Sequence, residues 1–454
     1  MPNPPLTRDL GAFVANLRFE DVPPAAVQSV MTAFADTISV AVAGANEDAP
    51  RLLEKMLAPT GNEATLFSGG RASALDAAWI NGTAAHALDY DDVAQQGGHP
   101  SAPLVSAILA EAEALGASGQ QMVLAYIAGF EVFADLARRD SDQHHNKGWH
   151  PTGIFGGIGA AAACAKLRNL DATQASMAMA IAASQSSGMM SNFGTMTKPF
   201  HAGRAAHSGV ASARLAAIGF TAALDTLENN PGFLTAVSPA GKVDLESPTR
   251  AGKQFQICTT NRLAIKKYPV CYGGHRALDG MLDLLQANAI KPGDVEKVTV
   301  HLSRRNAGML RNHQPKTGLA AKFSMQFAMA SALIARRAGL GELSDDFVNK
   351  SEVQELMQRV TMEPDDRNDP KRPGFAIHDQ VVVKMRDGRT LDSGPISNIR
   401  GDPEFPLQKN DVWMKFEDCV KVGNPRLPAR KLFDTIMSLD QLPAARELMR
   451  DFAP

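Results

Sequence analysis

Hydrophobic side chains recur at helical spacing through the first half of the chain. Between Pro24 and Gly44 they return every three or four residues, with proline near the start and glycine near the end, an arrangement that favours a helix. Ser118 and Asp171 stand where two later helices need N-caps. The same spacing predicts helices over residues 74–88, 102–115, 119–137, 154–167, 172–185 and 205–218.

Strand signals enter in the second half of the chain. Residues 295–302 end in alternation of Val298, Val300 and Leu302 with polar residues, which predicts a strand. Asp387 and Gly388 separate two short apolar runs, and this predicts a β-hairpin with a type I′ turn over residues 380–391. Helical spacing returns over residues 324–336, 353–360 and 411–452.

These patterns predict a mainly α protein with two domains, as a length of 454 residues also suggests. The large all-helical domain is expected to be discontinuous and to comprise residues 1–266 and 399–454. A smaller α+β domain is expected over residues 267–398. Residues 395–408 are the candidate linker.

Composition excludes several classes of protein. The 46 Lys and Arg residues balance 48 Asp and Glu residues, so the basic excess typical of nucleic-acid binding is missing. Four cysteines without CxxC spacing argue against disulfides and structural zinc. Residues 1–5 lack the pattern of a signal peptide, and no stretch approaches the roughly 20 apolar residues of a membrane helix. We therefore expect a cytoplasmic protein with no nucleic-acid or membrane partner.

The densest chemical motif lies at residues 195–207. Lys198, His201, Arg204 and His207 stand within ten positions, among small residues. Lys and Arg bind carboxylate or phosphate, and histidine can move protons near neutral pH. The motif predicts a site for a small acidic substrate. A basic loop that closes a helix–helix junction is the alternative.

Two further motifs precede it. Three carboxylates at residues 89–92, followed by His99, could bind a metal, but their spacing is not that of a calcium loop. The alternative for Asp91 and Asp92 is a solvated acidic turn. His150 stands between Trp149 and Pro151 before a glycine-rich helix, so it is either a rigid site residue or a packed histidine.

A fourth motif, residues 266–275, lies at the expected domain junction, where ligand sites are common. It holds Lys266, Lys267 and His275, and one of the two lysines is expected to be ordinary surface charge. No GxGxxG, Walker A, GxSxG or HExxH motif occurs. Nucleotide-dependent, serine-hydrolase and zinc-protease chemistry are therefore disfavoured.

The order of these four motifs resembles the MmgE/PrpD family, which includes 2-methylcitrate dehydratase, cis-aconitate decarboxylase and iminodisuccinate epimerase. The resemblance covers essentially the whole chain. It implies a helical domain built from both chain ends, a smaller α+β lid, a homodimer, and neither a metal nor an organic cofactor. The segments that carry it are residues 89–92 with 99–101, 148–153, 194–203 and 266–269.

The resemblance also assigns residues. It implies catalytic roles for four side chains and substrate binding for two, while the basic motif adds two more substrate-binding candidates. The catalytic set is Asp89, His99, His150 and Lys198; the substrate-binding set is Lys266, His275, His201 and Arg204. Two positions differ from the decarboxylase branch, which has histidine where this chain has Cys271 and threonine near Val93, and Phe327 stands where the family's lid helix has a tyrosine.

The chemistry that the resemblance implies is proton movement at carbon next to a carboxylate of a small di- or tricarboxylic acid. Such a carbon acid is weak, so preorganised cations must stabilise the developing charge, a role suited to Lys198 and Lys266. The favoured reaction is loss of water, as in a 2-methylcitrate dehydratase. The alternatives are epimerisation, decarboxylation of the cis-aconitate type and, in another class, a non-catalytic helical interaction protein.

Overall fold

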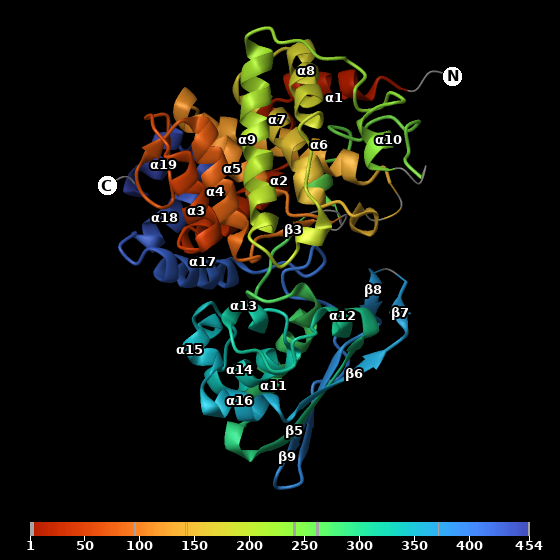
Figure 1. Cartoon of the computed structure of the whole chain (residues 1–454), viewed down its shortest axis with the longest axis vertical. Coiled ribbons are helices and arrows are strands. Elements are labelled where there is room, and N and C mark those ends of the chain that lie inside the picture. The colour runs from red at the N-terminus through yellow and green to blue at the C-terminus, as the bar shows by residue number, and fades with distance from the viewer. Residues whose placement is uncertain are drawn as a thin grey trace. The chain divides into compact units, whose positions relative to one another are not determined.

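Two units make up the structure, a computed structural model that describes residues 4–94, 97–140, 142, 144–238, 242–259, 263–370 and 372–452. The first unit lies within residues 1–265 and 412–454, and the second within residues 266–411 (Figure 1). Residues 1–3, on which the signal-peptide expectation partly rests, lie outside the described part.

Helices are the main elements of the first unit. Two short antiparallel strand pairs accompany them, β1 (Ala64–Thr65) with β2 (Arg71–Ala72) and β3 (Val93–Ala94) with β4 (Leu263–Ala264). The helices are α1 (Leu6–Asn16), α2 (Pro24–Gly44), α3 (Asp48–Leu57), α4 (Ala74–Ala87), α5 (Ser101–Leu115), α6 (Gly119–Ala137), α7 (Pro151–Leu167), α8 (Ala172–Ala183), α9 (Thr197–Ala217), α10 (Phe233–Val237), α17 (Lys409–Gly423), α18 (Ala429–Ile436) and α19 (Ala445–Met449).

Local signals explain where these helices begin. Ser118 and Asp171 accept hydrogen bonds from the backbone at N3 and form capping boxes with Gln121 and Gln174, as their sequences predict. Helix α9 begins at Thr197, eight residues before the predicted start, so the basic motif is helical and not a loop. Pro199 lies in the first turn of α9, where a missing backbone N–H costs no intrahelical bond.

Close helix packing places the start of α9 beside α4 and α7. A Cβ on Gly203 would lie 2.2 Å from the carbonyl oxygen of Trp79 in α4, and one on Gly209 would lie 2.3 Å from the Cβ of Ala160 in α7. Only glycine permits these approaches. The small residues of α9 therefore fix the position of the basic side chains in its first two turns.

Helix α2 corrects one expectation from composition. In the described part of the chain it is long and apolar enough to cross a membrane, with mean hydropathy 1.4 over its most apolar 18 residues. Of that window 72% is buried within the protein, as in the core helix of a folded domain.

The two ends of the chain belong to the same unit. Helix α18 packs against α2, and α19 packs against α5; Figure 1 shows the blue C-terminal helices beside the orange N-terminal ones. The return of helical spacing over residues 411–452 is thus explained by a tail that completes the helical unit.

The second unit packs helices on a mixed sheet with strand order β10-β9-β5-β6, in which β5 and β6 are parallel and the other neighbours antiparallel. The inward side chains of β5 include Val298, Val300 and Leu302, all buried, as their alternation predicts. The elements are α11 (His275–Ala287), β5 (Val295–Ser303), α12 (Arg304–Met309), α13 (Gly318–Ala321), α14 (Met325–Ala335), α15 (Asp345–Val348), α16 (Ser351–Met357), β6 (Val360–Asp365), β7 (Asn368–Asp369), β8 (Arg372–Ala376), β9 (Gln380–Met385) and β10 (Thr390–Asp392).

Two local predictions for this unit were wrong in detail. Helix α16 ends at Met357, and Val360 opens strand β6 because it pairs with Val298. The β9–β10 hairpin exists, but its turn is not type I′, since Gly388 has φ +89° while Asp387 has no positive φ. A turn with one left-handed residue matches a three-residue loop ending in glycine.

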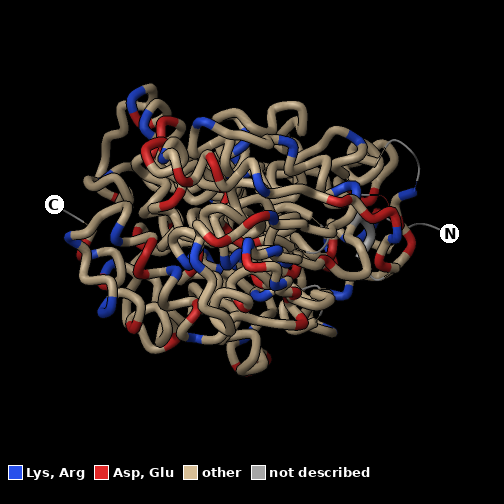
Figure 2. Tube along the Cα trace, turned by 90° about the horizontal axis from the view of Figure 1, so that it is seen from below, with Lys and Arg blue, Asp and Glu red and all other residues tan. Residues whose placement is uncertain are grey.

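The predicted fold class is confirmed: a mainly α protein with a large helical unit and a smaller mixed unit. Basic and acidic residues are interspersed along the trace in the view of Figure 2. This agrees with the nearly balanced charge of the whole sequence.

Candidate active site

Five of the predicted site residues meet at one end of the helical unit. Asp89 follows α4, His99 precedes α5, His150 is the N-cap of α7, and Lys198 and His201 lie in the first two turns of α9. Ion pairs, hydrogen bonds and ring contacts connect all five. Four helix ends and their loops thus converge on one cluster of charged and titratable groups.

An ion pair between Asp89 and Lys198 forms the exposed side of this cluster. The Lys198 Nζ lies 2.7 Å from Asp89 Oδ1, and the His99 Nε2 lies 3.6 Å from the same oxygen. The side chains of Asp89 and Lys198 retain 27% and 12% of their exposure. Asp89 has φ +52°, and non-glycine residues held in this region cluster at functional sites. The ammonium is therefore accessible and held in place.

Asp91 is the buried anion behind this pair. Both of its carboxylate oxygens lie 2.9 Å from His86 Nδ1, and Oδ2 lies 3.3 Å from His99 Nδ1. Burial opposes its ionisation, but His86 and His99 together hold the pKa of Asp91 well below its usual value. The solvated turn considered for Asp91 and Asp92 is wrong, because both side chains are fully buried.

Asp92 has a different environment from its neighbour. Its carboxyl group accepts hydrogen bonds from the backbone and hydroxyl of Ser101, whose Oγ lies 2.5 Å from the Tyr126 hydroxyl. Burial raises the pKa of Asp92 well above its usual value, and the charges of Asp36 and Asp91 add to the shift. Asp92 thus ties the loop to α5 and α6 through Ser101 and Tyr126.

A lysine from the C-terminal tail fixes the same loop. Lys415 in α17 donates to the Tyr90 carbonyl at 2.8 Å, and its Nζ lies 3.9 Å from the centre of the Tyr90 ring. The same Nζ lies 2.5 Å from Asp36 Oδ1 in α2. Both charged side chains are almost fully buried, so the tail anchors the loop that carries Asp89.

His150 and His201 form a buried pair. Their Nδ1 atoms lie 3.1 Å apart, and the side chains of both residues are buried. Burial lowers the pKa of His150 well below its usual value, with further lowering from the charges of His86 and Lys198. Burial likewise lowers the pKa of His201 to about 4. Both rings are therefore neutral near pH 7.

The ring of Phe193 connects this pair with the lysine. It lies edge-on to His150 with centroids 4.9 Å apart, and Lys198 Nζ lies 5.1 Å from its centre. His150 also stacks on His86 at 5.6 Å. His150 is thus a buried, packed histidine that also belongs to a network of titratable groups, so both interpretations of its motif stay open.

A group of four side chains in the described part of the chain could hold a metal ion, since its ligand atoms lie within 4.8 Å of one another. The donors are already engaged, however. Asp91 binds two imidazoles, and an ammonium lies 2.7 Å from an Asp89 oxygen, where a dication would be repelled. The geometry fits a carboxylate–ammonium–imidazole network better than a metal centre. The group consists of His86, Asp89, Asp91 and His99.

Arg204, which was predicted to bind substrate, contacts a different set of side chains. Its guanidinium lies 2.6 Å from His207 Nδ1 and 5.3 Å from the centre of the Trp79 ring. It also donates to Gln185 at 3.5 Å. Arg204 thus packs on α4 and bonds to Gln185 after α8, and its role in substrate binding stays a prediction.

Lys266 and His275 belong to the second unit. Lys266 is 3% exposed, while the neighbouring Lys267 is partly exposed and lies 3.0 Å from Asp411 Oδ1. His275 is fully buried at the start of α11, and its ring lies 5.0 Å from that of Tyr272. Their roles in substrate binding stay predictions.

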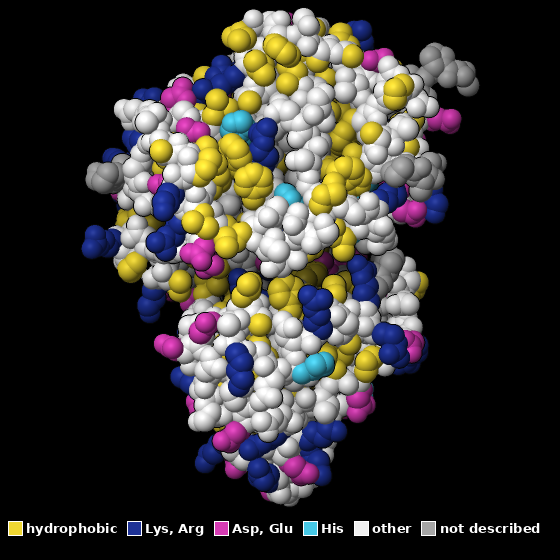
Figure 3. All heavy atoms as spheres, in the orientation of Figure 1, with side chains coloured by type: hydrophobic (Ala, Val, Ile, Leu, Met, Phe, Trp, Pro, Cys, Tyr) yellow, Lys and Arg dark blue, Asp and Glu magenta, His cyan; other side chains and the backbone are white. Residues whose placement is uncertain are grey.

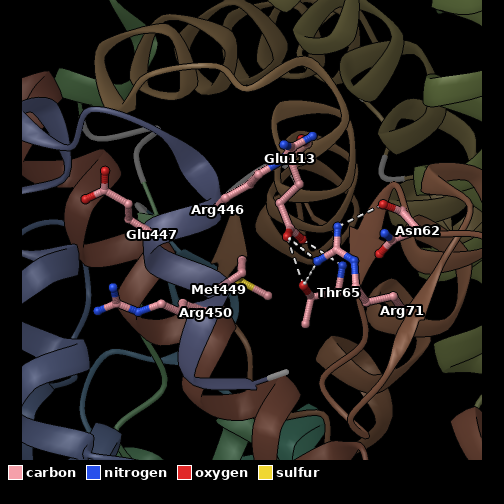
Figure 4. Close-up of a pocket in the computed structure, with 8 residues that line it drawn as sticks. All are labelled: Asn62, Thr65, Arg71, Glu113, Arg446, Glu447, Met449 and Arg450. Carbon is pink, nitrogen blue, oxygen red and sulfur yellow. Dashed lines mark hydrogen bonds and ion pairs between the residues drawn. The ribbon is translucent and has the colours of Figure 1, made fainter. Parts of the chain in front are cut away.

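A pocket of about 540 Å³ lies elsewhere in the helical unit. Its central charges are satisfied by one another: Arg71 bonds to Glu113, Thr65 and the Asn62 carbonyl. In Figure 4 the side chains of Glu447 and Arg450 point away from Arg71. This pocket therefore offers less to an anionic substrate than the network around Lys198.

Comparison with known proteins identifies the protein family of this chain. The MmgE/PrpD N-terminal domain matches residues 8–246, and the MmgE/PrpD C-terminal domain matches residues 268–440. The chain belongs to the MmgE/PrpD family.

The curated relatives have low sequence identity to this chain but align with most of its length. Human cis-aconitate decarboxylase is 29% identical over 391 residues, which span 83% of this chain and 77% of the relative. The mouse enzyme of the same name is 26% identical, over 82% of this chain and 77% of its own. The Aspergillus terreus cis-aconitate decarboxylase is 24% identical over 96% and 94%.

His86 and Phe193 were not predicted as site residues, and Asp91 was considered only as a possible metal ligand or as part of a solvated turn. His86 and Asp91 stand five residues apart across the end of α4. This spacing matches neither a helix nor a strand period, so the sequence does not indicate that the two side chains form a buried pair. Phe193 was one apolar residue in a Gly/Ser/Asn run. Its position became clear only in the structure, where its ring contacts both the His150 imidazole and the Lys198 ammonium.

Proposed function

We propose that this chain is a cofactor-independent lyase that moves a proton at carbon next to a carboxylate of a small di- or tricarboxylic acid. The observation that carries the proposal is the meeting of the Lys198 ammonium with neutral His150 around one phenylalanine ring. Family membership and the names of the curated relatives support the same class of substrate.

Each group has a task in such a reaction. A substrate carboxylate binds the Lys198 ammonium, which then stabilises the enediolate charge that forms when the neighbouring carbon loses its proton. His150 accepts that proton, since its ring is neutral at pH 7 and its buried Nε2 has no hydrogen-bond partner among the described residues. Asp89 holds Lys198 in place.

Loss of water is the favoured outcome. Dehydration needs a base for the carbon-bound proton and an acid for the leaving hydroxyl group. His99 supplies a second imidazole, with its ring centroid 6.5 Å from that of His150. Two histidines beside one ammonium thus suit dehydration better than decarboxylation, which needs only reprotonation.

Decarboxylation is the second candidate, because the curated relatives named above are cis-aconitate decarboxylases. Against it stands Phe327, at a position where the family's lid helix has a tyrosine. Phe327 is 2% exposed and its ring lies 6.4 Å from that of Phe347, so it offers no hydroxyl. Cys271 likewise replaces a histidine.

The test is incubation with a panel of di- and tricarboxylic acids in deuterated water, followed by mass and stereochemical analysis. Loss of water supports the proposal. Loss of carbon dioxide selects the second candidate, and deuterium uptake without loss of mass selects epimerisation. If no acid reacts or raises the melting temperature, the chain is a non-catalytic helical protein and the proposal fails.

The remaining expectations concern location and assembly. A cytoplasmic location and a homodimer stay proposals. Exposed hydrophobic side chains that follow α9, such as Ile218 at 83% and Phe220 at 54%, support self-association. Figure 3 shows further hydrophobic side chains at the surface of the helical unit. Sedimentation equilibrium tests the homodimer.

A further inference from the structure

The contact between His150 and His201 constrains where each ring carries its proton. It joins Nδ1 to Nδ1 at 3.1 Å, and a neutral imidazole has one N–H and one lone pair. One ring must therefore donate from Nδ1 while the other accepts at Nδ1. The tautomers of the two rings are coupled, since the donor has its lone pair at Nε2 and the acceptor carries its proton there.

Burial indicates which ring is the donor. His150 Nε2 is buried and has no hydrogen-bond partner among the described residues. An orphaned N–H is less common in a protein interior than an under-satisfied acceptor. His150 is therefore expected to donate from Nδ1 and to keep its lone pair at Nε2, which is the form a base needs.

We propose that His201 is a positioning residue and proton relay for His150: it fixes the Nδ1–H tautomer of His150 and takes the proton from that nitrogen after His150 Nε2 has been protonated. This inference rests on the proposed function and deepens it. It moves His201 from the substrate-binding role that the sequence predicts to a role behind the base.

The proton movements balance. His150 Nε2 takes a proton from the substrate carbon, and the ring becomes an imidazolium. Its Nδ1 proton then passes along the 3.1 Å bond to His201 Nδ1. His150 is left neutral, with a proton on Nε2 and a lone pair on Nδ1, so it can release the Nε2 proton only when His201 returns a proton to Nδ1. His201 becomes the imidazolium and releases its Nε2 proton to solvent, which it reaches more readily because it is 7% exposed against 1% for His150.

The backbone around Gly188 restricts the positions of these two histidine rings. The His150 amide donates to the Gly188 carbonyl at 3.0 Å. Gly188 has φ +124°, and a Cβ there would lie 3.3 Å from His201 Cγ and 3.4 Å from His150 Cβ. Glycine is therefore needed at this position, both for its conformation and for the space between the two imidazoles.

The first test needs no substrate. Histidines are labelled with nitrogen-15, and a two-bond proton–nitrogen spectrum shows which ring nitrogen of His150 carries the proton. We expect Nδ1–H in the wild type and in His201→Asn, because the Asn carbonyl oxygen can accept the same bond. We expect loss of that preference in His201→Ala. A His150 tautomer of the Nε2–H form in the wild type, or one unchanged by His201→Ala, overturns the proposal.

The second test separates relay from positioning. Neither variant can take up a proton at residue 201, so kcat should fall by at least about 10-fold in both, a modest part of a typical acid–base contribution, while KM changes by less than about 3-fold. His207→Asn is the matched control, since His207 lies on the same helix, is also lowered in pKa to about 4, and bonds to Arg204 instead of His150. A His201→Asn enzyme within about 2-fold of wild-type kcat contradicts the relay.

The two tests also separate this inference from the proposed function. If no carboxylic acid reacts with the wild type, the proposed function fails, while the tautomer measurement still decides whether His201 controls His150. If the wild type is active and the tautomer is insensitive to residue 201, only the inference fails.

Discussion

Replacing Lys415 by methionine is expected to destabilise the helical unit strongly. The Nζ of Lys415 lies 2.5 Å from Asp36 Oδ1 and donates to the Tyr90 carbonyl at 2.8 Å. Its side chain is 3% exposed and that of Asp36 is fully buried. Methionine fills similar space but leaves the carboxylate of Asp36 without its countercharge. Removing one partner of a buried ion pair costs about 3–5 kcal/mol, and we expect a loss of that size.

The assay is urea unfolding of the purified chain, followed by circular dichroism. Lys421→Met is the control, because Lys421 is exposed on the same helix. The double variant Asp36→Asn/Lys415→Met should recover at least about 2 kcal/mol, since it removes the unpaired charge. Lys415→Met as stable as Lys421→Met would refute the argument that the C-terminal tail holds the Asp89 loop through a buried charge.

Three further predictions follow from the site and its surroundings. His150→Gln should keep KM within about 3-fold while kcat falls at least about 100-fold, because glutamine cannot move a proton; adding His99→Gln should deepen the loss in the same steady-state assay. Activity should survive exhaustive chelation, and recovery only on adding a divalent ion would contradict the ammonium network. Burial raises the pKa of Glu131 to about 7, so its neutral form stabilises the fold below pH about 4.5, and this stability is lost as pH rises through 7. Glu131→Gln should therefore gain up to about 3 kcal/mol relative to wild type between pH 5 and pH 8 in urea unfolding.

The sequence predicts most of the fold because helical spacing and caps are local signals. Ser118 and Asp171 cap the helices that they were expected to cap, and the alternation in β5 gives its inward face. The sequence-based prediction failed where contacts with a distant segment determine the secondary structure. Val360 reads as the end of a helix until it is paired with Val298 of β5. The start of α9 was obscured by its proline and its basic residues.

For the site, the basic motif and the histidines were visible because their residue types are chemically unusual together. The environment of the acidic motif was not visible. Asp91 and Asp92 look like a solvated turn, yet both are buried: two imidazoles lower the pKa of Asp91, while burial raises that of Asp92 beside Ser101. Burial of this loop depends on Lys415, more than 300 residues away in sequence, and no local pattern encodes such a contact.

The central claim is that the Lys198 ammonium and the neighbouring imidazoles move a proton next to a substrate carboxylate. The most direct measurement is the rate at which deuterium from the solvent enters, or water leaves, the carboxylic acid turned over by the wild type, compared with Lys198→Ala. We predict a decrease of at least about 100-fold, the scale of one preorganised electrostatic group, with an unchanged circular dichroism spectrum. A folded Lys198→Ala enzyme with near-wild-type rates would contradict the account.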